Sequence, residues 1–102
     1  MAKGYWIGRV DVTDEERYRR YVEANAGAFA RFGARFLVRG GTFEAVEGQA
    51  RGRNVVVEFP DYATALACYR SEEYAAAMAH RLSAAEADII VGEGYDGPQP
   101  GE

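Results

Sequence analysis

The order in which strand-like and helix-like segments alternate constrains the fold of this chain more than any other feature. Residues 4–12, 35–47, 53–59 and 88–95 are rich in β-branched and aromatic residues and predict four strands. The stretches after the first and third of these have helical periodicity. With right-handed crossovers, the order β-α-β-β-α-β predicts a ferredoxin-like α+β fold, an antiparallel four-stranded sheet with helices on one face.

The first helical stretch opens with a capping motif. The side chains of Thr13 and Glu16 can each satisfy the other's backbone N–H, so they predict the start of the helix. Gly33 is the expected left-handed stop. Between them runs a stripe with spacings of three and four residues, which predicts the buried face of the helix. The stripe comprises Tyr18, Tyr21, Val22, Asn25, Ala26, Phe29 and Phe32.

The second strand segment, residues 35–47, is long for a single strand. Gly40-Gly41 falls in its middle, so we expect a bulge there, and a tight turn between two short strands is the alternative. Residues 48–52 hold two glycines and predict the hairpin loop to the third strand.

The second helical stretch has two start signals. Pro60 ends the third strand, and Asp61 can cap the helix that follows. Ser71 is a further capping candidate inside the helical region, which predicts a kink or break at Arg70-Ser71. Ala84-Ala85 fits either the end of the helix or a loop.

Apolar residues occupy both faces of the predicted sheet. Val55 and Val57 point one way and Val56 the other, and residues 89–91 repeat the pattern. A sheet with one wet face would alternate apolar and polar residues. The helices cover one face, and no third layer exists in the sequence. We therefore expect a homodimer in which the sheet faces pack together.

Length, charge and cysteine content exclude several classes of protein. The 102 residues suit one domain, expected over residues 1–96 with a short C-terminal tail at 97–102. A net charge of −4 without a basic run argues against nucleic-acid and membrane partners. No leader or membrane span is evident, and Cys68 stands alone, so a cytoplasmic location is predicted. One cysteine and one histidine predict no metal site.

Taken together, short motifs along nearly the whole chain resemble the small bacterial proteins of domain-of-unknown-function family 1330. The resemblance implies a dimeric α+β barrel, an architecture shared with cofactor-free monooxygenases, muconolactone isomerases and haem-degrading enzymes, but no particular activity. Gly33-Ala34 departs from the paired glycines of many members. The matching segments are Tyr5-Trp6-Ile7, Val10-Asp11-Val12, Tyr21 with Asn25, Arg39-Gly40-Gly41, Glu47-Gly48, Phe59-Pro60, Tyr69 with Ser71 and Tyr74, Arg81, and Glu93-Gly94.

Asn25 is the most informative single residue, because a polar amide lies on the apolar stripe of the first helix. A buried amide without a hydrogen-bond partner costs about 1–3 kcal/mol. Asn25 therefore either makes a structural bond to a strand, a tyrosine or an arginine, or it anchors a ligand in a pocket between helices and sheet. The sequence leaves both interpretations open.

Two arginines are the candidate anion-binding groups. Arg39 precedes Gly40-Gly41, where a ligand could approach the backbone. The alternative, which the glycine pair favours, is a bulge with Arg39 paired to Glu47, Asp88 or an acid of a partner chain. Arg81 could bind an anionic ligand or an acid on the last strand. His80 is predicted to be solvated and Cys68 to be core packing.

Four tyrosines are expected to face the sheet, either as core or as the lining of a pocket with hydroxyl donors. They are Tyr18, Tyr21, Tyr69 and Tyr74. The sequence predicts binding of a small anionic or aromatic metabolite without a cofactor, with isomerase or monooxygenase chemistry as one option. It assigns no catalytic residue. The alternative is a non-catalytic dimeric interaction or stress-associated module with a structural polar core.

Overall fold

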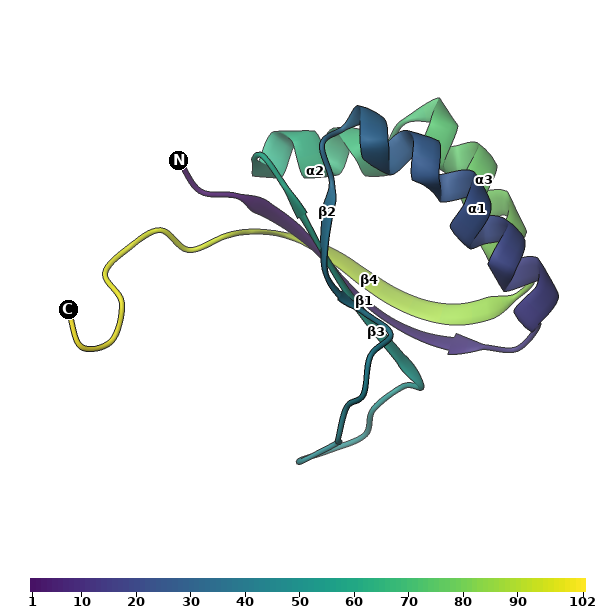
Figure 1. Ribbon diagram of the computed structural model, residues 1–102, viewed down its shortest axis with the longest axis horizontal. Coiled ribbons are helices and arrows are strands. Elements are labelled where there is room, and N and C mark those ends of the chain that lie inside the picture. Colours follow the sequence, from purple (N-terminus) through teal and green to yellow (C-terminus); the bar gives the residue numbers. More distant parts are fainter.

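The computed structural model describes residues 1–102 as a four-stranded antiparallel sheet with three helices on one side (Figure 1). The strands lie in the order β2-β3-β1-β4, which is the order expected for a ferredoxin-like fold. The strands are β1 (Gly4–Val12), β2 (Arg35–Arg39), β3 (Arg53–Phe59) and β4 (Ala85–Glu93). The helices are α1 (Glu15–Arg31), α2 (Tyr62–Tyr69) and α3 (Glu72–Leu82).

Helix α1 begins one residue later than the capping box predicts. Asp14 is the N-cap, and its carboxylate accepts a hydrogen bond from the Arg17 N–H at 3.1 Å. The Thr13 N–H instead donates to the Ala84 carbonyl at 2.8 Å, which ties the end of β1 to the start of β4. The Asp14 N–H donates to the same carbonyl at 3.1 Å, so Ala84 fixes the turn that leads into the helix at Asp14. The expected capping role of Thr13 is therefore wrong.

The buried stripe of α1 follows the predicted spacing, except that Ala28 is buried where Ala26 was predicted. Tyr18, Tyr21, Asn25 and Phe29 are buried together with Ala28. The predicted Ala26 is exposed, because it lies on the opposite side of the helix from Ala28. After the helix, Gly33 adopts φ +71°, the left-handed stop that the sequence predicts.

Strand β2 is much shorter than predicted. It ends at Arg39, because Gly40 adopts φ +68° and its N–H donates to the Asn54 carbonyl at 2.9 Å. The bulge lies between Phe36 and Val38 rather than at the glycine pair. Residues 41–52 form a loop that extends away from the helices (Figure 1), so the expected strand beyond residue 39 and the short hairpin loop are both wrong.

The second helical region breaks where the sequence predicts. Asp61 caps α2 by accepting from the Thr64 N–H at 2.7 Å. Ser71 caps α3 by accepting from the Tyr74 N–H at 3.1 Å, and its hydroxyl donates to the carbonyl of Cys68 at 2.7 Å. Strand β4 begins at residue 85 and ends at 93, so it starts earlier and ends earlier than predicted.

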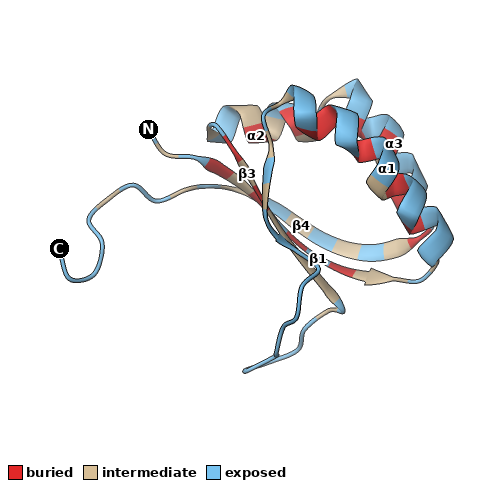
Figure 2. Cartoon of the chain, viewed as in Figure 1, coloured by how far each residue is buried: buried red, intermediate tan, exposed pale blue.

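The core lies between the helices and one face of the sheet, and Trp6 is at its centre. Buried residues occur where helices and strands face one another, whereas the loop and tail are exposed (Figure 2). The Trp6 indole N–H donates to the Ala65 carbonyl at 2.8 Å. Four rings surround it at centroid distances of 4.9–5.5 Å, from Phe29, Phe59, Tyr69 and Tyr74. Such aromatic pairs contribute about 0.5–1.5 kcal/mol each beyond burial.

The opposite face of the sheet carries an apolar stripe in this single chain. Ile7 pairs across the strands with Val56 and Ile90, and Ile7 and Ile90 are 43% and 61% exposed. Arg51 from the loop bridges Asp11 and Asp88 at one end of this face. No helix of the chain is both long enough and apolar enough to cross a membrane.

Candidate functional site

A cavity lies between α1, α3 and the sheet, on the face that carries the core. Its volume is about 40 Å³. That is room for roughly three water molecules. Ten of its fifteen lining residues are hydrophobic, so the walls suit a compact apolar body.

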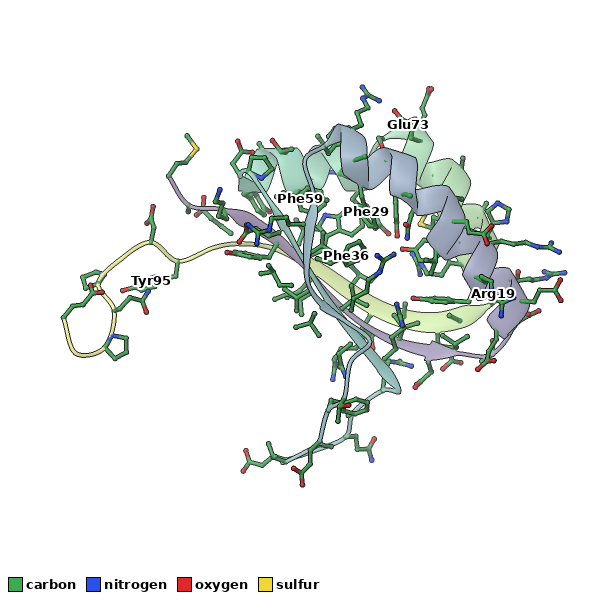
Figure 3. All side chains as sticks on the ribbon, viewed as in Figure 1. Arg19, Phe29, Phe36, Phe59, Glu73 and Tyr95 are labelled. Atoms are coloured by element: carbon green, nitrogen blue, oxygen red, sulfur yellow. The ribbon has the colours of Figure 1, made fainter.

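Strand alternation and helical periodicity bring the lining residues together. Residues 6, 8 and 10 of β1 point to the helices, as do residues 53, 55 and 57 of β3, since the register pairs 8 with 55 and 10 with 53. Gly8 contributes empty space, because a Cβ there would meet Ile89 Cγ1 at 3.6 Å, an ordinary contact. Figure 3 shows Phe29 of α1 and Phe36 of β2 meeting inside the fold, with their ring centroids 5.4 Å apart.

Three buried polar atoms of residues that line this cavity have no hydrogen-bond partner. They are Asn25 Oδ1, Arg53 Nε and Arg81 Nε. Asn25 and Arg81 are only 4% and 6% exposed. More than nine in ten buried polar groups in proteins are paired, so three unpaired atoms around one cavity are a departure that needs an explanation. The structural hydrogen bond that was one interpretation of Asn25 is not formed.

The charge of the cavity wall is positive. Arg39, Arg53 and Arg81 line it, and no aspartate, glutamate or histidine does. The ion pairs of the chain use other arginines, at positions 17, 20, 31 and 51. Within this chain, therefore, neither Arg39 nor Arg81 has an acid partner. Burial acts to lower the pKa of Arg81, but Tyr74 and Tyr21 raise it above its usual value, so the guanidinium is charged.

Tyr18 and Tyr21 line the cavity and bring their hydroxyl groups to it. Burial is the largest cause that raises the pKa of Tyr18 above its usual value. The Tyr21 hydroxyl lies 2.6 Å from that of Tyr74, and burial followed by this contact raises the pKa of Tyr74. These groups can donate hydrogen bonds to a ligand or to one another, and they are poor proton acceptors at neutral pH.

Five of the seven predicted binding residues line the cavity, and two do not. Tyr74 lies behind the wall, where it supports Tyr21. Tyr69 packs on Trp6 and donates to Met78 Sδ at 3.6 Å, so it belongs to the core. The five residues that line the cavity are Tyr18, Tyr21, Asn25, Arg39 and Arg81.

The sequence interpretation missed Arg53, although the signal was present. Arg53 alternates with Val55 and Val57, so a strand period of two places it on the helix-facing side of β3. Its guanidinium lies against Gly40, where any Cβ would collide with Nη1. Arg39 stands at the exposed mouth, with its guanidinium 3.9 Å above the Phe36 ring. The Arg39-Gly40 motif thus supplies one cation and leaves room for a second.

The remaining reactive side chains lie elsewhere. His80 is exposed on α3, as the sequence predicts. Cys68 is fully buried, and burial, assisted by Glu73, raises the pKa of its thiol to about 12. No group of three or more histidine, cysteine, aspartate or glutamate side chains is arranged to hold a metal ion.

The family model described as Domain of unknown function (DUF1330) matches residues 3–95. The chain belongs to the DUF1330 family. No curated protein sequence matches it. The DUF1330 chain is similar to the crystal structure of RPA0582, a protein of unknown function from Rhodopseudomonas palustris, with a TM-score of 0.76 and 17% identity over 94% of this chain and 85% of that one.

Two further solved structures share the fold of the DUF1330 chain. SnoaB, a cofactor-independent oxygenase from Streptomyces nogalater, has a TM-score of 0.63 and 10% identity, with all of both chains covered. A conserved protein of unknown function from Bacteroides thetaiotaomicron, described as a possible oxidoreductase, has a TM-score of 0.54 and 13% identity over 90% of this chain and 97% of that one. These likenesses establish the α+β barrel fold for the DUF1330 chain.

Proposed function

We propose that this DUF1330 protein binds a small organic anion with an aromatic or unsaturated body in the cavity between its helices and sheet. The unpaired Nε donors of Arg53 and Arg81 carry the proposal. Two charged guanidinium groups that face an apolar cavity without an acid are unfavourable on their own, and an anionic ligand removes that penalty. A carboxylate, phenolate or enolate oxygen supplies the missing acceptor.

The same arrangement supports cofactor-free chemistry on the bound anion. Charged donors in an apolar site stabilise negative charge that develops on oxygen, as in an enolate. No aspartate, glutamate or histidine lines the cavity to act as a general base. The substrate therefore enters already ionised, and reaction of its enolate with oxygen is the chemistry that fits. The shared fold of a cofactor-independent oxygenase supports this class of reaction, at the level of fold.

A second copy of the chain is proposed to cover the other face of the sheet. All 102 residues are already placed, and none of them covers the stripe that contains Ile7, Val56 and Ile90. A two-fold axis brings such a stripe against itself. Ile7→Glu combined with Ile90→Glu is expected to give monomers in light scattering after gel filtration. An unchanged oligomeric state would contradict the proposed interface.

The ligand site is tested by calorimetric titration with single-ring carboxylates, phenolates and cyclic 1,3-diketones. Arg81→Met and Arg53→Met are expected to abolish the binding of any ligand that the wild type takes. Gly8→Ala is expected to weaken binding by filling space while every polar group is retained. Arg20→Gln is the matched control, since Arg20 pairs only with exposed Glu16. Equal affinity in Arg81→Met and wild type would sink the proposal.

A further inference from the structure

The three unpaired atoms in the cavity differ in hydrogen-bonding character. Arg53 Nε and Arg81 Nε are donors, and Asn25 Oδ1 is an acceptor. A simple anion satisfies the two donors and leaves the amide oxygen unpaired. A ligand that satisfies all three atoms must therefore carry hydrogen-bond acceptors for the two arginines and a hydrogen-bond donor for Asn25.

No group of the protein forms a hydrogen bond with any of these three atoms. Arg81 lies over the ring of Tyr21, with its Cζ 5.4 Å from the centroid, and Arg53 lies over Tyr18 at 5.5 Å. The two rings are neighbours on α1, with centroids 5.4 Å apart. Each guanidinium is therefore placed by a tyrosine face of the same helix, and neither forms a hydrogen bond to Asn25 Oδ1. Both guanidinium groups line the same cavity, and a carboxylate offers one oxygen to each.

We propose that the ligand of this cavity is a hydroxy acid, a carboxylate with a hydroxyl group on the same compact body. Its carboxylate accepts hydrogen bonds from Arg53 and Arg81, and its hydroxyl donates to Asn25 Oδ1. The proposal deepens the proposed function, on which it rests, by naming the substrate class. The small, mostly hydrophobic cavity holds only the carboxylate, the hydroxyl and the atoms between them, so the rest of a one-ring body lies at the Arg39 mouth.

Asn25 is the residue that selects for the hydroxyl group. A site built to bond a hydroxyl discriminates against the analogue that lacks it, because the buried polar partner is then left unpaired. An O-methyl derivative carries the same oxygen without the proton, so it cannot donate to Asn25 Oδ1. Benzoate, the isomeric hydroxybenzoates and the matching methoxybenzoates therefore form a set of probes that isolates the donor.

The experiment titrates these probes into wild-type protein and into Asn25→Leu, which has a similar volume and no polar atom. In the wild type, at least one hydroxybenzoate is expected to bind roughly five- to tenfold more tightly than benzoate and than its methoxy analogue. In Asn25→Leu that preference is expected to vanish while benzoate affinity is retained. Arg81→Met is expected to lose all of the probes.

Three other results would each contradict a different claim: the hydroxy-acid ligand, the role of Asn25, or the anion site itself. Benzoate binding that needs Arg81, with no gain from any hydroxyl, would overturn the hydroxy-acid proposal and leave the anion site intact. A hydroxyl preference that survives in Asn25→Leu would overturn the role of Asn25 and with it the proposal. No binding of any probe by the wild type would overturn both the hydroxy-acid proposal and the anion site.

Discussion

Replacement of Asn25 by leucine is expected to stabilise the ligand-free protein. The Asn25 side chain is 4% exposed, and its amide oxygen has no partner. An unsatisfied buried polar group costs about 1–3 kcal/mol. The lower end applies, because the amide is uncharged. Leucine removes that cost and has nearly the same volume, and the cavity absorbs the difference in shape.

The magnitude has a second, smaller component. Leucine is a better helix former than asparagine by about 0.4 kcal/mol, and position 25 lies in the middle of α1. The two effects together raise the free energy of unfolding by about 1.5 kcal/mol. For a chain of this length, that corresponds to an increase in melting temperature of about 6–12 °C.

Urea denaturation followed by far-ultraviolet circular dichroism measures this difference, with equal m-values as the check that both proteins unfold in the same way. An increase in the free energy of unfolding no larger than the helix-propensity component would show that the unpaired amide does not destabilise the folded state. A loss of about 1 kcal/mol or more would show that Asn25 makes a stabilising bond. Either result would refute the reasoning, and the second would favour the non-catalytic module with a structural polar core.

Three further predictions concern other parts of the fold. Tyr21→Phe is expected to destabilise the protein by about 1–3 kcal/mol, because it leaves the Tyr74 hydroxyl unpaired. The double variant Tyr21→Phe with Tyr74→Phe is expected to lose less stability than the sum of the two single variants. Additive losses in urea denaturation would contradict the pairing. Cys68 is expected to react with a thiol reagent only after unfolding, because its pKa is raised to about 12 and it is fully buried; rapid reaction in the native protein would refute this. The Asp11 carboxylate accepts a hydrogen bond from the Gly52 N–H, and this bond together with Arg51 lowers the pKa of Asp11 below the usual 3.8. The contact therefore stabilises the loop fully above pH 3.8. This stabilisation is lost as the pH falls through the pKa of Asp11 in the folded protein. The Gly52 amide shift should titrate with a midpoint below 3.8, and a midpoint above it would exclude the bond.

The sequence predicted those parts of the fold that local chemistry determines. Gly33, Asp61 and Ser71 act where the sequence placed them, because stops and caps depend on a few neighbouring residues. The second strand was predicted too long, because Phe43 and Val46 have strand propensity. Pairing is non-local, however, and β3 begins only at residue 53, so nothing lies beside the chain after Gly40.

The site was predictable where one helix presents it. Tyr18, Tyr21 and Asn25 share the stripe of α1, and a single period places all three in the cavity. Tyr69 packs in the core rather than on the cavity, because the break before Ser71 separates the face of α2 from that of α3. Arg53 was missed, because charged residues usually lie at the surface, whereas its alternation with Val55 and Val57 places this half-buried residue on the helix-facing side of β3.

Trp6 gives the protein an optical reporter at its centre. It is the only tryptophan of the chain, so emission excited at the red edge of its absorption comes from one known place. One side of its indole forms part of the cavity wall, and the other contacts the rings that hold α2 and α3 to the sheet. Ligand entry and loosening of the helices therefore change the surroundings of the same chromophore. An occupant that excludes water should shift the emission to shorter wavelength, whereas helix detachment should shift it to longer wavelength.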